Sequence, residues 1–201
     1  RQMCIRDRFV KVHERQELGE HGNADQWIHT LASMDEVAKI VRRESLGPKE
    51  AMVIMLATLC GNLAPGDADG GRASERRRTP DLQVAKDFLE SIKADNQTRD
   101  TTLALIASRL IPGSLYVEDR LRGNEVTDGQ VRRIADQIHP ASIRQLLLVA
   151  EADHLGRGAF ASESPEALMM PRDSFPARDW LLERARKLGI EEKKAGPVIQ
   201  G

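Results

Sequence analysis

The chain has 201 residues, of which 40% are hydrophobic and 30% charged, and its formal net charge is -1. This length and composition predict one globular domain with its own core, and exclude a disordered chain. The near-zero charge also excludes a whole-molecule field for nucleic acid, and an aromatic content of 3% argues against a surface on which bases stack.

The two cysteines, Cys4 and Cys60, are far apart in the sequence. They form neither a metal-binding pair nor a disulfide framework, which favours a reducing, cytoplasmic compartment. No apolar run reaches the ~18 residues of a membrane span, so we expect no membrane partner.

The ends of the chain differ from its middle. Residues 1–8 resemble translated sequencing-adapter read-through, and we exclude them from fold reasoning as one would a tag. Residues 9–24 are charged and irregular, which indicates the remnant of a linker. We expect the helical domain over residues 25–188, followed by a truncated tail at residues 189–201.

The first helix is predicted from Asp25, a plausible N-cap, to about Glu44. Its apolar face repeats at three-to-four spacing through Trp27, Leu31, Met34, Ala38 and Val41. His29 falls on the far side of that stripe. Periodicity alone therefore predicts a half-exposed helix histidine there.

A second helix, at residues 51–60, is apolar nearly all round, which predicts a central buried position. The composition then changes to a Gly-, Asp- and Arg-rich stretch at residues 61–79, typical of a surface loop. Its Arg76–Arg78 run is expected to be solvated, with RNA phosphate contact as the weaker alternative.

Further helices are predicted at residues 81–93, 98–111, 127–138, 141–155 and 175–188, with a connector at residues 112–125. Thr98 and Thr127 are the expected caps of two of them. Asp153 and Arg157 lie four residues apart and can pair within a turn, whereas His154 is expected at the surface. The predicted fold is an all-α bundle of about seven helices.

Two blocks of sequence carry a resemblance to a known family. Glu20-His21-Gly22-Asn23-Ala24-Asp25-Gln26-Trp27-Ile28-His29-Thr30-Leu31 is similar to the opening of HD-domain metal-dependent phosphohydrolases, in the version fused to bacterial tRNA nucleotidyltransferases (CCA-adding enzymes) and poly(A) polymerase-like proteins. Ala152-Asp153 with Gly156-Arg157 resembles the last motif of that region. The resemblance implies an HD-type helical fold and His29 as the first metal ligand. Asp153 is a weaker ligand candidate, and His21, Asp25 and Arg157 are further candidates for the site.

Other family positions have changed. Gly61 and Asn62 stand where the family has its His-Asp doublet, and Arg109 stands where it has a further histidine. Glycine offers no ligand, and arginine is permanently protonated. The divalent metal that the family binds (Mg, Mn or Ni) is therefore expected not to bind here. Restoring His at 61 and Asp at 62 is expected to restore binding if the remaining ligands are intact.

A reading-frame error at residues 61–79 is an alternative origin of the lost doublet. The composition of that stretch is what GC-rich codons give out of frame. Arg109 lies outside the stretch, so the same error does not account for it. Resequencing the source DNA decides between the two origins.

Three functions are possible, of which the first two follow from the resemblance and the third treats it as chance. The first is the C-terminal HD-like region of a tRNA nucleotidyltransferase-type protein, without metal catalysis of its own and with tRNA as a partner through the parent protein. The second is a working metal-dependent phosphohydrolase on phosphomonoesters or 2',3'-cyclic phosphates, and the third is an unrelated all-α interaction module. The chain lacks Gly-Gly-x-x-Arg-Asp and Asp-x-Asp motifs, so it should not add nucleotides alone. The oligomeric state stays open.

Overall fold

The computed structural model describes residues 23–61, 82–157 and 169–190, and every regular element in these ranges is helical. The prediction of an all-α fold is confirmed. The elements, in order, are α2 (Asn23–Arg43), α3 (Pro48–Gly61), α4 (Leu82–Ser91), α5 (Asn96–Ser108), α6 (Ile111–Tyr116), the π-helical η2 (Val117–Leu121), α7 (Asp128–Gln137), α8 (Ile143–Gly156) and α10 (Ala177–Lys187).

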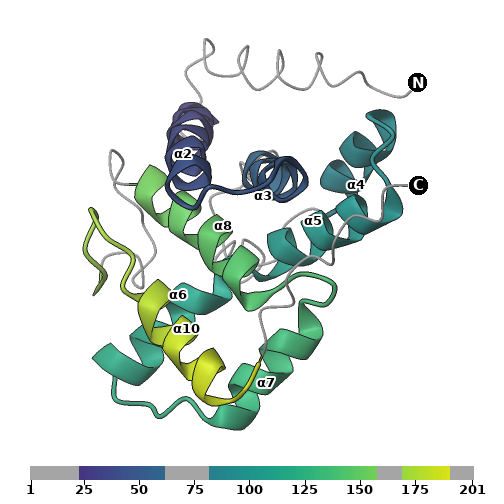
Figure 1. The fold of residues 1–201 in the computed structure, drawn as a ribbon. Helices are drawn as coiled ribbons and strands as arrows, with labels where there is room; N and C mark the ends of the chain where they lie inside the picture. The colour runs from purple at the N-terminus through teal and green to yellow at the C-terminus, as the bar shows by residue number, and fades with distance from the viewer. Residues whose placement is uncertain (1–22, 62–81, 158–168, 191–201) are drawn as a thin grey trace.

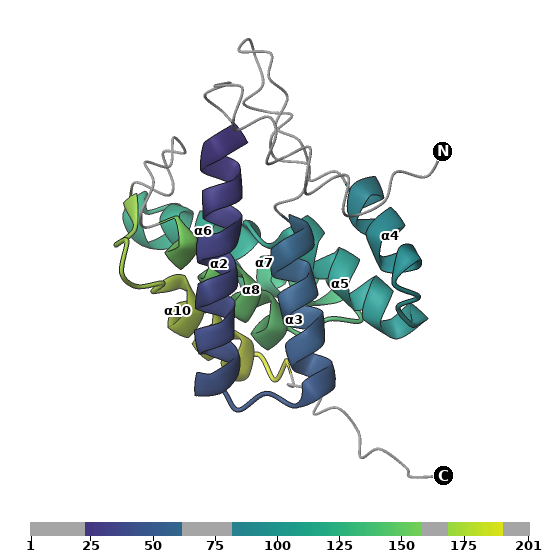
Figure 2. The same ribbon diagram turned by 90° about the horizontal axis from the view of Figure 1, so that it is seen from above.

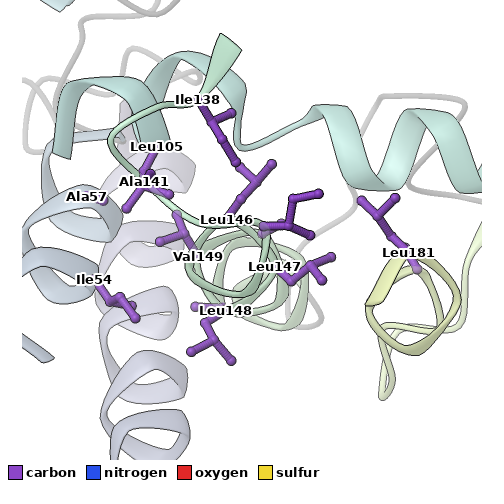
Figure 3. Packing of buried hydrophobic residues seen from close by; sticks show 14 of the residues in the cluster. Ile54, Ala57, Leu105, Ile138, Ala141, Leu146, Leu147, Leu148, Val149 and Leu181 are labelled. Carbon is purple, nitrogen blue, oxygen red and sulfur yellow. The ribbon is translucent and has the colours of Figure 1, made fainter. Parts of the chain in front are cut away.

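Helix α8 is the centre of the fold. It contacts α2, α3, α5, α6 and α10, and it lies between the α2–α3 pair and the α6–α10 group (Figure 1). Residues 146–149 are all buried and point to different sides of the helix, toward Ile54 of α3 and Leu181 of α10 among others (Figure 3). Four successive positions cover a full turn, so α8 is buried all round.

The sequence had predicted that central position for α3 instead. In the structure, Met52 and Met55 of α3 are exposed, at 44% and 36%. The sequence of α3 does not reveal this exposed face, because a methionine contributes to an apolar run whether it is exposed or buried.

Helices α2 and α3 lie side by side across α8 (Figure 2). The buried face of α2 consists of Thr30, Ser33, Val37 and Ile40, whereas Leu31 is 48% exposed. The predicted inner stripe is therefore wrong at Leu31, whereas its members Met34 and Val41 are half-buried and pack against the core. Small and β-branched side chains line the contact because α2 approaches α8 closely. A Cβ on Gly156 would lie only 2.7 Å from the Ser33 Cα.

The predicted helix starts are partly corrected. Asp25 lies inside α2 and is not its N-cap, since the helix already begins at Asn23. Asp95, not Thr98, caps α5: its carboxylate accepts from the Thr98 backbone N–H at 3.0 Å and the Thr98 hydroxyl at 2.7 Å. Thr127 caps α7 as predicted, with Gln130 completing a capping box.

The predicted connector at 112–125 is also wrong in its first half, because α6 and η2 occupy residues 111–121. Pro112-Gly113 suggested a break, but proline is favoured in the first turn of a helix, where its missing N–H costs nothing. Pro112 and Val117 are buried there.

Gly61 is the last residue of α3 and not part of a loop. The structure does not describe residues 62–81, which include the rest of the predicted loop and its Arg76–Arg78 run. Residues 1–22 and 191–201 also lie outside the described ranges. No helix within the described ranges is both long and apolar enough to cross a membrane.

Candidate functional site

Four helices bring together residues that are far apart in the sequence. The His29 Nε2 of α2 lies 3.2 Å from the Asp153 Oδ1 of α8, and the Arg109 Nε at the end of α5 lies 3.9 Å from the same oxygen. A Cβ on Gly61, at the end of α3, would lie 3.3 Å from the Arg109 Cδ. One site therefore contains four positions singled out from the sequence: His29, Gly61, Arg109 and Asp153. We call these four residues, together with Arg157, which pairs with Asp153, the Asp153 cluster.

Asp153 is the buried anion of this cluster, with 4% of its surface exposed. Its Oδ2 accepts a hydrogen bond from the Arg157 guanidinium one turn later. Burial alone would raise the pKa of Asp153, but Arg157, His29 and Arg109 outweigh it and hold the pKa below the ordinary value. Asp153 is therefore ionised at neutral pH.

The His29 ring is fixed by hydrogen bonds on both of its nitrogens. Nε2 faces the Asp153 carboxylate, and Nδ1 lies 3.3 Å from the Ser33 hydroxyl. Because an ionised carboxylate only accepts, we assign a proton to Nε2, which donates to Asp153. No free lone pair of the ring therefore points toward Asp153.

Ser33, His29 and Asp153 are connected in the order of a catalytic Ser-His-Asp triad. However, Ser33 is 0% exposed and packs against the backbone of α8 at Gly156. A substrate carbonyl has no room beside that hydroxyl. The role of Ser33 is to orient the imidazole, not to attack a substrate.

Arg109 fills the space that Gly61 leaves. Its Nη1 donates to the Ile106 carbonyl at 3.1 Å, while its Nε is buried and has no hydrogen-bond partner among the described residues. Burial lowers the pKa of Arg109, the nearby Asp153 raises it, and Arg157 lowers it further. Since a Cβ at position 61 would already press on the Arg109 side chain, Gly61 and Arg109 form one coupled pair.

The described residues do not fit a divalent metal ion. They contain no group of three or more His, Cys, Asp or Glu side chains that could hold one. Of the expected ligands only His29 and Asp153 come together, and Arg157, His29 and Arg109 already surround the Asp153 carboxylate. A permanent guanidinium charge stands beside this carboxylate, where a metal would need an open position.

The remaining candidates are placed as follows. His21 and Asn62 lie outside the described residues, and only the backbone of Asp25 is described, within α2. Arg157 and Asp153 form the expected pair four residues apart. The Cys60 thiol is buried beside Gly61, and burial raises its pKa to about 12, so it is no nucleophile.

His154 corrects a prediction. It was expected at the surface but is 6% exposed. Its Nε2 donates to the Pro171 carbonyl at 2.7 Å, and its ring lies 5.2 Å from the Phe175 ring, centroid to centroid. These contacts connect α8 to the segment before α10, so His154 is a structural residue.

Sequence reasoning missed Ser33 and a second charged cluster. The spacing of four between His29 and Ser33 could have indicated their contact. The second cluster joins three arginines to three glutamates at distances of 2.7 to 3.1 Å, across α2, α3, α8 and α10. Its members are Arg43, Arg144 and Arg178 with Glu44, Glu50 and Glu151. Apart from the neighbours Arg43 and Glu44, its partners lie 94 to 134 residues apart, so no local pattern reveals it.

No family model, curated protein or solved structure matches this chain. The HD-domain resemblance accordingly rests on the two sequence blocks alone.

Proposed function

We propose that this chain is the HD-like helical C-terminal part of a tRNA nucleotidyltransferase-type protein, and that it has no metal-dependent catalysis of its own. In this proposal the helical bundle is a cytoplasmic structural module. It contacts tRNA only through the parent protein.

One observation carries the proposal. His29, Gly61, Arg109 and Asp153 come from four different helices, and they meet around a single carboxylate. These are the positions that the family resemblance links to one site. An unrelated bundle has no reason to bring these four positions together.

The loss of catalysis has its own support. Arg109 supplies a permanent positive charge beside Asp153, and Gly61 makes room for it. Arginine neutralises the carboxylate but has no open coordination position that could activate a water molecule. The alternative of a working metal-dependent phosphohydrolase has less support, because it requires a metal to displace this guanidinium.

The first experiment is a hydrolysis assay on the full chain with bis-p-nitrophenyl phosphate and 2',3'-cyclic AMP. We expect no turnover above background with added Mn²⁺, Ni²⁺ or Co²⁺. Metal-dependent turnover that His29→Ala abolishes would establish the phosphohydrolase alternative instead.

The second experiment addresses the parent protein. Sequencing the source DNA upstream of the codon for Phe9 is expected to reveal an in-frame segment with the Gly-Gly-x-x-Arg-Asp and Asp-x-Asp motifs of a nucleotidyl-transfer domain. An open reading frame that encodes an unrelated domain there would favour the unrelated all-α module.

A further inference from the structure

The Asp153 cluster carries more positive than negative charge. Arg109 and Arg157 both lie against Asp153, which is the one carboxylate that pairs with either of them within the described ranges. Two guanidinium groups therefore share a single carboxylate.

The second charged cluster of this protein provides the comparison. There, Arg43, Arg144 and Arg178 face three glutamates, so the positive and negative charges are equal. The Glu151 carboxylate accepts two hydrogen bonds from Arg43, at 2.9 and 2.8 Å. The fold thus contains one arginine network with equal numbers of arginines and carboxylates. The Asp153 cluster, in contrast, has one more arginine than carboxylates.

The Asp153 cluster also has unused hydrogen-bond donors. A guanidinium offers five N–H donors. Arg109 uses its Nη1 for a backbone carbonyl, and its Nε is buried without an acceptor. A buried charged donor without an acceptor is unfavourable. An added anion would relieve both the excess charge and the shortage of acceptors.

We propose that Arg109 and Arg157 bind one phosphate group, with Asp153 holding both guanidinium groups in position. The planar guanidinium fork matches the oxygens of a phosphate. Solvent reaches the cluster mainly at Arg157, whose side chain is 26% exposed, compared with 14% for Arg109 and 15% for His29. One excess positive charge matches the single negative charge of a phosphodiester. This proposal does not depend on the HD-domain resemblance.

The test is a titration of the full chain with inorganic phosphate and, separately, dimethyl phosphate, followed by calorimetry at constant ionic strength with chloride as the balancing anion. We expect saturable one-to-one binding that is at least about tenfold weaker in Arg157→Gln, because one charge-assisted contact is lost. Arg132→Gln is the matched control, since Arg132 is an exposed arginine on α7. Tighter binding of dimethyl phosphate would indicate a phosphodiester backbone as the source, and tighter binding of inorganic phosphate a free or terminal phosphate.

The proposal is overturned if the wild-type chain shows no saturable binding, or if Arg157→Gln and Arg132→Gln bind as the wild type does. If Arg157→Gln does not fold, ¹⁵N NMR of the arginine Nε groups in the wild type replaces it. Phosphate must then shift the Arg109 and Arg157 resonances more than those of the other arginines. Equal or larger shifts elsewhere would contradict the proposed site.

Discussion

Asp153 is the residue on which the charges of the site depend. It is buried and ionised, and it contacts two guanidinium groups and one imidazole. Removing its charge leaves two arginines facing each other without an anion. Removing one partner of a buried ion pair lowers the free energy of unfolding by more than the intact pair adds to it, because an uncompensated charge stays buried.

We therefore expect Asp153→Asn to lower the free energy of unfolding by about 3–5 kcal/mol. The measurement is urea denaturation followed by circular dichroism. Asp136→Asn is the control, since Asp136 is an exposed carboxylate on α7 and should change stability little. An Asp153→Asn variant as stable as the wild type would mean that the cluster contributes no net stability.

The same residue should give the protein an acid-sensitive stability. The pKa of Asp153 in the folded chain lies below its unfolded value of about 3.9. The unfolded state thus binds more protons as the pH falls below that value, and stability decreases there. Denaturation midpoints measured between pH 7 and pH 3 should fall less steeply in Asp153→Asn than in the wild type, and equal slopes would contradict this assignment.

Gly61 and Arg109 should behave as one unit. A histidine at position 61 must displace the Arg109 side chain, so Gly61→His alone is expected to destabilise the chain by about 1–3 kcal/mol. Its cost should shrink when Arg109→Ala is also present, and a double-mutant cycle measures this coupling. Additive effects would show that the two side chains do not compete for space. The predicted recovery of metal binding by Gly61→His with Asn62→Asp should therefore be measured with Arg109→Ala added, because Arg109 occupies the space beside position 61.

At the scale of elements, the contact of α2 with α8 holds His29 in place. At this contact Ser33 of α2 packs directly against Gly156 of α8. A Cβ on Gly156 would lie 2.2 Å from the Ser33 Oγ and 2.6 Å from the Ser33 backbone nitrogen. The backbone cannot yield as a flexible side chain would, so the two helices would have to separate.

Gly156→Ala is expected to destabilise the protein by about 3 kcal/mol or more. Gly129→Ala in α7 is the matched control, because its nearest neighbour would lie 3.9 Å away. An alanine there should be neutral or stabilising by about 0.5–1 kcal/mol. Thermal melts of both variants check the contrast, and equal melting temperatures would show that α2 and α8 are not closely packed at Ser33.

Helix existence could be predicted from the sequence better than helix orientation. The apolar periodicity located α2, α3, α7, α8 and α10, because each must bury a stripe of side chains. It did not locate the centre of the buried face of α2, where the closest packing uses Thr30, Ser33 and Val37 and leaves Leu31 exposed. Hydrophobicity ranks leucine above serine, but the space between two close helices favours the smaller residue.

The candidate site could not have been predicted from local pattern. His29 and Asp153 are 124 positions apart, and periodicity placed His29 away from the core. Only the family resemblance connected them. The resemblance also linked Gly61 and Arg109 to the same site, but their direct contact depends on where the ends of α3 and α5 meet.

For the whole molecule, we propose that the Arg109 guanidinium stands where an HD-type site would hold a metal ion. The net charge of -1 gives no general attraction for RNA, so any contact with phosphate must come from a local group such as Arg109 and Arg157. The same arginines that would bind phosphate would repel a divalent cation. Both properties follow from the charge around one carboxylate.

Calorimetric titration of the wild-type chain with Ni²⁺ tests this claim most directly. The guanidinium of Arg109, and the lack of a third ligand among the residues that the structure describes, predict no saturable uptake near His29. The wild type and His29→Ala should therefore give the same heats. One-to-one uptake of Ni²⁺ by the wild type that disappears in His29→Ala would contradict the claim.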